Sequence, residues 1–285
     1  MTIKLLKVME KVAFQGEHGA FSEIASKFFF SEEVTNIPSY SFEEVFSRVK
    51  NSKVDFGIVP IENTLYGSVF ETYDLLLKYS LTIVGELNLQ INHYLIAQKK
   101  YKLTEIERIY SHPQALGQCS EFLSRFKRTH ITPAYDTAGA AILALENKTE
   151  PSAAIASIEA AEFYDLEVIE SNIQNNKENY TRFLVISREK NDAEVLNPKT
   201  SICFELKSIP GALFKALSVF ALRDIDLVKI ESRPIPQKPF QYTFYVDLLG
   251  SLDDERIILA INNLAEISNN IKKFGTYNIG ETYSS

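Results

Sequence analysis

The stretch KVAFQGEHGAFSEIASKFFF, residues 11–30, contains the pattern that decides the fold class. Its first residues form a short apolar run typical of a buried strand, and the glycine turn Gly16-Glu17-His18-Gly19 follows directly. Residues 20–30 then have the periodicity of a helix. A strand, a glycine turn and a helix in this order begin a β-α-β unit, so the sequence predicts an α/β fold.

The same alternation of strands and helices continues to about residue 188. Further strands are predicted at 54–60, 81–87, 92–97, 109–110, 130–134, 152–156 and 181–187, and helices at 42–51, 114–126, 138–146 and 158–164. Asp136 and Thr137 are good N-cap residues for the helix at 138–146. Strands that alternate with helices indicate one domain with largely parallel sheets, and we place it at 11–188.

A different rhythm follows a polar segment at 189–199, which we interpret as a linker. Residues 200–280 have the order of a ferredoxin-like βαββαβ module. Its strands are predicted at 201–206, 227–232, 240–248 and 271–277, and its helices at 210–223 and 254–267. A module of this size seldom holds a deep catalytic cleft, so we expect a sensing or assembly role for it.

The composition restricts the class of protein. With 45% hydrophobic residues the chain can bury a large core, and its net charge of -7 disfavours a nucleic acid partner. No apolar stretch approaches the length of a membrane span, and the first residues lack the features of a secretory signal. We therefore expect a cytoplasmic enzyme of small-molecule metabolism, with no nucleic acid and no membrane partner.

The cysteines and histidines give no sign of a metal or a disulfide. Cys119 and Cys203 fall in different predicted domains and belong to no CxxC pair. The four histidines show no ligand spacing, so we treat them as structural or surface residues. No metal and no other cofactor is expected.

Polar side chains follow predicted strands, at the sheet edge where open α/β proteins bind ligands. Glu62, Asn63 and Thr64 come directly after an apolar strand, where an acid and an amide are poorly placed for packing. Thr181 and Arg182 begin the strand at 181–187, and a core strand would need neither a hydroxyl nor a guanidinium. These residues are candidates for a functional site.

Two further segments are open to a structural interpretation. The turn at 16–22 could be a tight loop with Ser22 facing solvent as readily as a binding loop. Ser111 could cap a helix on which Gln114 and Gln118 share one face, and by itself this amphipathic helix is the preferred interpretation.

In combination, these segments resemble the prephenate dehydratases that have a C-terminal ACT domain. The markers, in family order, are GEHGAFSE (16–23), VPIENTLYGSV (59–69), SHPQALGQC (111–119), DTAGAA (136–141), NYTRF (179–183), PGALFKAL (210–217) and KIESRP (229–234). Each is weak alone, whereas all of them in order are highly specific.

The resemblance implies a reaction and a set of roles. The family removes the ring carboxylate of prephenate as carbon dioxide and the ring hydroxyl as water, which gives phenylpyruvate and needs no cofactor. Thr181 would donate a hydrogen bond to the departing hydroxyl, Glu62 and Asn63 would form an active-site pair, and Ser111 and Gln118 would contact the substrate. The candidates for further substrate binding are Arg182, Ser22 and Thr64; for Arg182 a structural salt bridge is an almost equal alternative.

The resemblance also implies two lobes and an effector. The family's catalytic domain is similar to type II periplasmic binding proteins, and we place the crossings between lobes near 88–92 and 168–173, with substrate in the cleft. The ACT motifs imply feedback inhibition by phenylalanine, bound between the subunits of a homodimer or homotetramer. The implied effector residues are Gly211, Ala212, Leu213, Glu231, Ser232, Arg233 and Pro234.

Two other functions fit the same motifs. An arogenate dehydratase would carry out the sister reaction and form phenylalanine directly, although the lack of a plastid transit peptide favours prephenate. A non-enzymatic amino-acid sensor would also use two lobes and an ACT module. Only about ten residues precede the first strand, so we expect no fused chorismate mutase.

Overall fold

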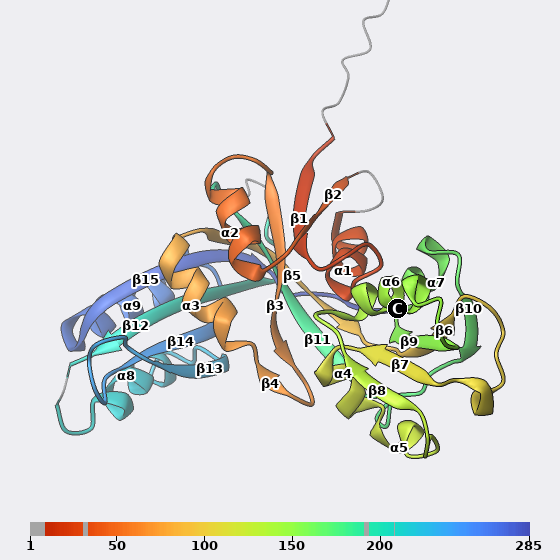
Figure 1. Ribbon diagram of the computed structural model, residues 1–285. Coiled ribbons are helices and arrows are strands. Elements are labelled where there is room, and N and C mark those ends of the chain that lie inside the picture. Colours follow the sequence, from red (N-terminus) through yellow and green to blue (C-terminus); the bar gives the residue numbers. More distant parts are fainter. Residues whose placement is uncertain (1–8, 31–33, 191–193, 208) are drawn as a thin grey trace, which may run out of the picture.

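The computed structural model describes residues 9–30, 34–190, 194–207 and 209–285. Three sheets organise the chain, one in each of two lobes and one in a C-terminal domain, with helices packed against them (Figure 1). The predicted α/β class, the two lobes and the C-terminal βαββαβ module are confirmed. Residues 191–193 of the expected linker lie outside the described part of the chain.

The first lobe holds the sheet with the order β16-β5-β11-β3-β1-β2, to which β4 adds beside β3. Its elements are β1 (Lys11–Gln15), α1 (Phe21–Phe30), β2 (Thr35–Ser39), α2 (Phe42–Lys50), β3 (Phe56–Asn63), β4 (Gly67–Ser68), α3 (Phe70–Tyr79), β5 (Thr82–Gln90), β11 (Tyr180–Ser187) and β16 (Thr282–Ser284).

The second lobe holds a sheet with the order β10-β6-β9-β7-β8. Its elements are β6 (Tyr94–Ala97), the 3-10 turn η1 (Leu103–Glu105), β7 (Arg108–Ser111), α4 (Pro113–Gln118), α5 (Ser120–Leu123), β8 (His130–Pro133), α6 (Thr137–Glu146), β9 (Ser152–Ala156), α7 (Ile158–Phe163) and β10 (Glu167–Glu170). The helix predicted at 114–126 is two short helices, because Cys119 leaves helical geometry with φ -110° and ψ 19°.

Both sheets are mixed, which corrects the expectation of largely parallel sheets. Strand β11 runs antiparallel to β3 and β5, and β6 runs antiparallel to β9 and β10. Strands β11 and β6 each enter their lobe from the other one, so they start at the edge where the neighbouring strands end. The crossings lie at 91–93 and 171–179, since β10 still belongs to the second lobe.

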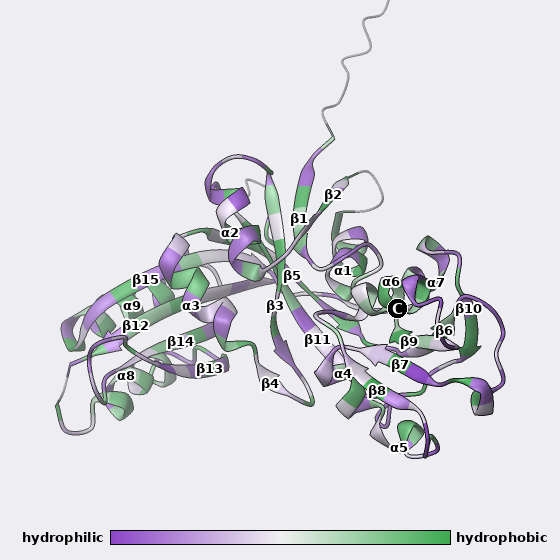
Figure 2. Ribbon diagram, in the orientation of Figure 1, coloured by the Kyte–Doolittle hydropathy of each residue, from purple (hydrophilic) through white to green (hydrophobic). Residues whose placement is uncertain are grey.

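The C-terminal domain packs one face of its sheet on two helices and the other face on the first lobe. It contains β12 (Pro198–Leu206), α8 (Ala212–Ala221), β13 (Leu227–Pro234), β14 (Tyr242–Leu249), α9 (Glu255–Ile267) and β15 (Ser268–Asn278), with the antiparallel sheet order β13-β14-β12-β15. Figure 2 shows α8 as hydrophobic over most of its length: its inner side faces this sheet, and its outer side carries the exposed Phe214.

The C-terminal domain and the first lobe share one hydrophobic core. Tyr245, Phe274 and Tyr277 of the C-terminal sheet are buried in the same cluster as Val59 and Ile83 of the first lobe. A fully buried apolar side chain contributes about 1.5–3 kcal/mol, so these contacts hold the two parts together as one packed body. After β15 the chain returns to the first lobe, where β16 pairs in parallel with β5.

Four elements of the first lobe were not predicted, and the shortest is the two-residue strand β4 (Gly67–Ser68). Strand β2 is a polar edge strand that contains Pro38, a residue that weakens a strand signal and is tolerated at a sheet edge. Helix α3 begins after Val69, which provides no side-chain cap. Strand β16 is only a few residues long. Among the described residues, no helix is both long and apolar enough to cross a membrane.

Candidate active site

A cavity of about 410 Å³ lies between the two lobes. The first lobe contributes Ser22 at the start of α1, Asn63 at the end of β3 and Thr181 at the start of β11. The second lobe contributes Gln118 of α4 and the first residues of α6. Three of the residues expected at an active site, Asn63, Thr181 and Gln118, therefore line one cavity, although they are far apart in sequence.

Asn63 and Thr181 form the centre of the first-lobe side. They are partners in the ladder between β3 and β11, and the Asn63 amide Nδ2 donates to Thr181 Oγ1 at 3.0 Å. The same amide nitrogen also lies within hydrogen-bonding distance of Asn179 Oδ1 at 2.8 Å. The Thr181 oxygen accepts from Asn63, and no hydrogen bond donated by the Thr181 hydroxyl is found among the described residues, so its proton can be donated into the cleft.

The other end of the Asn63 amide holds the turn between β3 and β4. Its Oδ1 accepts from the backbone N–H groups of Leu65 and Tyr66, each at 3.0 Å. The Tyr66 hydroxyl then crosses the cleft and donates to the carbonyl oxygen of Gln114 on α4 at 3.3 Å. Asn63 thus links the position of Thr181 to a contact between the lobes.

Gln118 is held by a buried histidine. His93 Nε2 lies 2.6 Å from Gln118 Oε1, and His93 Nδ1 has no partner among the described residues. Burial lowers the pKa of His93 to about 4, so the ring is neutral near pH 7. An unpaired acceptor is tolerated better in a core than an unpaired N–H, which places the proton on Nε2. The His93 ring therefore donates to Oε1 of Gln118 and leaves its amide N–H groups available to the cleft.

The N-terminal loop of the first lobe contacts the second lobe directly. Asp136 caps α6, and its carboxylate also accepts from the backbone N–H of Glu17 at 3.1 Å. The predicted capping role of Asp136 is confirmed, and burial raises its pKa. Ser157 donates to the carbonyl oxygen of Gly19 at 2.6 Å. The two lobes are therefore in contact at the starts of α6 and α7 as well as at Tyr66.

The lining of the cavity has an unusual charge distribution for an anion site. Among the described residues that line it there is no lysine and no arginine, and the carboxylates are Glu71 and Asp136. An anionic ligand would be held by neutral donors such as the hydroxyls of Ser22, Thr137 and Thr181. Fixed neutral donors in a site shielded from water can stabilise developing charge better than mobile water does.

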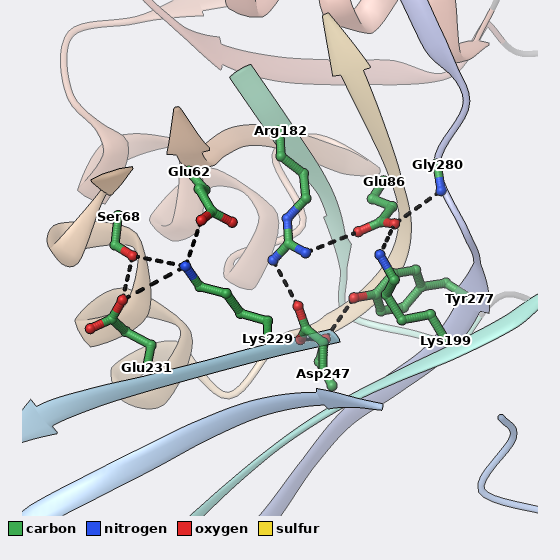
Figure 3. Close-up of polar contacts among 11 residues, drawn as sticks. Glu62, Ser68, Glu86, Arg182, Lys199, Lys229, Glu231, Asp247, Tyr277 and Gly280 are labelled. Carbon is green, nitrogen blue, oxygen red and sulfur yellow. Dashed lines mark hydrogen bonds and ion pairs between the residues drawn. The ribbon is translucent and has the colours of Figure 1, made fainter. Parts of the chain in front are cut away.

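Glu62 and Arg182 lie on the opposite side of these strands. Successive side chains of a strand point to opposite faces, so the neighbours of Asn63 and Thr181 point away from the cleft. Glu62 accepts from Lys229 of β13 at 2.6 Å, and Arg182 donates to Asp247 of β14 at 2.7 Å (Figure 3). The structure does not bring Glu62 or Arg182 to the cavity, and for Arg182 it shows the salt-bridge alternative.

The environment of Arg182 explains why it remains charged although it is largely buried. Burial alone would lower the pKa of Arg182, but the carboxylates of Asp247 and Glu86 outweigh that effect and raise the pKa overall. Lys199 also pairs with Glu86. The cluster is therefore a compensated set of charges between the first lobe and the C-terminal domain.

The remaining expected substrate contacts are divided. Ser22 lines the cavity. Ser111 is fully buried and donates to the carbonyl oxygen of Ile155 at 2.7 Å, outside the lining. Thr64 lies outside the lining too, where its hydroxyl donates to the carbonyl oxygen of Glu178 at 3.1 Å and accepts from the N–H of Tyr180 at 2.9 Å.

The expected effector residues fall into two groups. Gly211 has φ +72° and precedes α8, whose first residues are Ala212 and Leu213. On β13, Ser232 and Pro234 are exposed, while Glu231 and Arg233 point toward the first lobe. The alternation of the strand thus divides the motif between its two faces.

Sequence reasoning missed His93 and Tyr66 as residues of this region. The expectation that the histidines are structural or surface residues holds in part, because His93 is buried, but it also lines the cavity. No spacing in the sequence marks His93, because its role is to hold Gln118, a residue 25 positions later that meets it only in the folded structure. Tyr66 lies within a marker segment, but the contact across the cleft depends on the relative position of the lobes.

Comparisons with known proteins agree with this arrangement. The family model described as prephenate dehydratase matches residues 12–191, and the one described as ACT domain matches residues 200–266. The chain is 40% identical over 288 residues to arogenate dehydratase/prephenate dehydratase 2 of Arabidopsis thaliana, a match that covers 95% of this chain and 74% of the relative.

Two solved structures have the same architecture over almost the whole chain. A prephenate dehydratase from Arthrobacter aurescens in complex with L-Phe has a TM-score of 0.85 at 31% identity, over 94% of this chain and 90% of the other. The protein GqqA, described as a novel type of quorum quenching acylase, has a TM-score of 0.84 at 28% identity, over 94% of this chain and 97% of the other.

Proposed function

We propose, from the premise that this chain belongs to the prephenate dehydratase family, that its cleft binds prephenate and releases phenylpyruvate. The enzyme is a carbon-oxygen lyase. Cleavage of the bond between the ring and its carboxylate releases carbon dioxide, and the electron pair moves through the ring and expels the hydroxyl at the opposite carbon. One proton from solvent completes the departing water, and the ring becomes aromatic.

The observation that carries the proposal is the hydrogen bond from Asn63 to Thr181. It orients the Thr181 hydroxyl as a donor, which is the role that a departing hydroxide requires. Proton donation to a leaving oxygen is typically worth about 10²- to 10⁴-fold in rate. A threonine hydroxyl is a weak acid, so Thr181 acts as a hydrogen-bond donor or relay, and Gln118 supplies further amide donors to the dianion.

We further propose feedback inhibition by phenylalanine in a homodimer or homotetramer. The exposed side chains of Phe214 on α8, of Leu222 directly after this helix, and of Val228 and Ile230 on β13 support an assembly through the C-terminal domain. A cytoplasmic location is part of the proposal, and the free, buried Cys119 and Cys203 fit a reducing compartment.

Arogenate is the second candidate substrate. The Arabidopsis relative is named for both activities, and arogenate has an ammonium group where prephenate has a ketone. Glu71 and Asp136 are carboxylates of the cleft lining, and a carboxylate that faces the substrate would favour the ammonium. The two substrates therefore have to be compared side by side.

The test is turnover of the purified full chain with each substrate. Prephenate should yield phenylpyruvate faster than arogenate yields phenylalanine, and Thr181→Val should lose about 10²- to 10⁴-fold in kcat while Thr181→Ser retains most of it. A faster reaction with arogenate would select the second candidate. No product from either substrate would overturn the proposed reaction and favour a sensor or an activity like that of GqqA. Full activity of Thr181→Val would refute the role assigned to Thr181 and leave the reaction itself in place.

A further inference from the structure

Strand β13 presents two different faces along its length. The side chains of Lys229, Glu231 and Arg233 point toward the first lobe, while those of Val228, Ile230, Ser232 and Pro234 are exposed. Within the described part of the chain β13 is an edge strand of its sheet, and β14 is the one strand that pairs with its backbone. Strand β13 can therefore shift more easily than the strands inside the sheet.

The inner face of β13 contacts three successive parts of the first lobe. Lys229 Nζ donates to Glu62 Oε1 on β3 at 2.6 Å and to Ser68 Oγ on β4 at 3.2 Å. Ser68 in turn donates to Glu231. Arg233 reaches α3, where it pairs with both carboxylate oxygens of Asp74 at 3.1 and 2.8 Å.

Four of the charged residues at this boundary form a regular arrangement, which we call the interdomain quartet: Glu62, Arg182, Lys229 and Asp247. Glu62 and Arg182 are ladder partners in the first lobe, and Lys229 and Asp247 are ladder partners in the C-terminal domain. The ion pairs Glu62–Lys229 and Arg182–Asp247 join the two ladders at 2.6 and 2.7 Å (Figure 3). Each residue therefore has one partner within its own sheet and one across the boundary.

Glu62 and Arg182, the first-lobe half of the quartet, are the sequence neighbours of Asn63 and Thr181, which we call the catalytic pair. Glu62 precedes Asn63 on β3, and Arg182 follows Thr181 on β11. A displacement of either backbone by the quartet would change the 3.0 Å contact between Asn63 Nδ2 and Thr181 Oγ1. A hydrogen bond weakens steeply as its geometry departs from the optimum, so a small shift suffices to alter the donor.

The two ion pairs are not equally fixed. The side chains of Arg182 and Asp247 are 14% and 10% exposed, and Glu86 and Ser201 also contact this pair. The side chains of Lys229 and Glu62 are 16% and 33% exposed, and Lys229 belongs to the edge strand. We therefore expect the Arg182–Asp247 pair to stay in place and the Lys229–Glu62 pair to be the one that changes its geometry.

We propose that Lys229 and Glu62 transmit the state of the C-terminal domain to the catalytic pair. A ligand bound at the outer face of β13 moves this strand, the Lys229–Glu62 pair shifts β3 against β11, and the Asn63–Thr181 hydrogen bond changes. This inference rests on the proposed inhibition by phenylalanine and names its route into the cleft.

The test compares Lys229→Met with two other variants of the full chain. Lys229→Arg keeps the charge, and Lys272→Met removes another lysine of the C-terminal sheet that binds the first lobe. Lys272 donates to the carbonyl oxygens of Leu76 and Leu77, both at 2.9 Å, and to Ser80 Oγ at 3.0 Å, so among the described residues its hydrogen bonds go to α3 and the residue that follows it. Prephenate turnover is measured with and without phenylalanine, and phenylalanine binding is measured by calorimetry.

Allosteric coupling typically changes a ligand's affinity by roughly 5- to 150-fold. For the wild type we expect a change of that order in kcat/KM at saturating phenylalanine. In Lys229→Met the ratio of kcat/KM without phenylalanine to kcat/KM with it should approach one, while phenylalanine binding and basal turnover persist. Lys229→Arg and Lys272→Met should remain inhibited.

Each other result overturns the inference for an identifiable reason. No turnover by the wild type refutes the proposed reaction, and turnover without a phenylalanine response refutes the regulation; either removes the signal to be transmitted. An inhibited Lys229→Met variant refutes the route alone. Equal loss in Lys272→Met would assign the coupling to general contact between the domains, and a Lys229→Met variant that no longer binds phenylalanine would place Lys229 in the effector site.

Discussion

The side-chain amide of Asn63 donates a hydrogen bond of 3.0 Å to the hydroxyl oxygen of Thr181, a residue 118 positions later in the chain. The bond exists because β11 returns from the second lobe and starts beside the end of β3. The direction of this bond decides the chemistry: an oxygen that accepts from Asn63 can use its own proton for the substrate. The first prediction tests this direction.

Asn63→Asp should reverse the bond. A carboxylate can still accept from the N–H groups of Leu65 and Tyr66, but it would also accept the Thr181 proton and turn it away from the substrate. We expect kcat to fall by about 10²-fold or more, the scale of a lost donor, with a smaller change in KM. Steady-state kinetics of prephenate turnover measure both.

Asn36→Asp is the matched control for this prediction. Asn36 lies on β2 of the same sheet, and its Oδ1 accepts from Ser26 at 2.6 Å, a role that a carboxylate preserves. This variant should turn over like the wild type. Equal losses in the two variants, or none in Asn63→Asp, would contradict the assigned direction.

Gly19→Ala should push the lobes apart. Gly19 has φ +87°, and an added Cβ would lie 2.5 Å from Cα of Ala160 in the second lobe, which is closer than any real contact. Gly67→Ala is the control, because Gly67 has φ +77° with open space around it. Both variants acquire similar backbone strain, of about 1–2 kcal/mol, so a rise in KM that is specific to Gly19→Ala would report the lobe contact. Equal KM values would argue against it.

His93 should make stability depend on pH in the acidic range. Burial lowers its pKa from 6.5 to about 4, so between these values the unfolded chain binds a proton that the folded chain does not. The contribution is complete above pH 6.5 and is lost as pH falls toward 4, where the accumulated loss in the free energy of unfolding is about 3 kcal/mol.

His93→Asn should remove this part of the pH dependence. Chemical unfolding at a series of pH values gives the slope for each protein, and the difference from wild type isolates His93 from the carboxylates that titrate in the same range. His130→Asn, at an exposed position, should keep the wild-type slope. A slope unchanged by His93→Asn would mean that the folded protein accommodates the protonated ring.

Arg182→Met should destabilise the protein strongly. It removes the cation that faces Asp247 and Glu86 in a buried cluster, and loss of one partner from a buried pair typically costs about 3–5 kcal/mol. Thermal unfolding measures the effect. Lys78→Met breaks the exposed pair with Glu43 and should leave the transition unchanged, so similar shifts in both variants would refute the special role of the buried cluster.

The sequence carried enough information for the fold and for part of the site. Residues 11–30 fold as the strand, turn and helix that their pattern predicts, and Asp136 caps α6 as expected. Asn63, Gln118 and Thr181 meet in one cavity, as the family motifs implied. In each case the signal is local or belongs to a short motif.

The positions of Glu62 and Arg182 depend on strand length and register, which the sequence does not state. The strand predicted at 54–60 continues to Asn63, so Glu62 lies inside β3 and alternation turns it away from the cleft. A shift of one residue exchanges the two faces of a strand, so an expectation based on neighbouring residues is sensitive to this detail. The partners Lys229 and Asp247 come from a domain whose docking no local pattern reveals.

The return of β16 to β5 has a mechanical consequence. Residues 194–281 leave the first-lobe sheet and come back to it, so the C-terminal domain is connected to the first lobe at both of its ends. One connection is the chain before β12, and the other is made by β16 and by the hydrogen bond from the N–H of Asn88 to the carbonyl oxygen of Glu281. Together with the shared hydrophobic core, these two connections keep the C-terminal domain on the first lobe of its own chain. If the C-terminal domain were exchanged between two copies of the chain, β16 would first have to separate from β5.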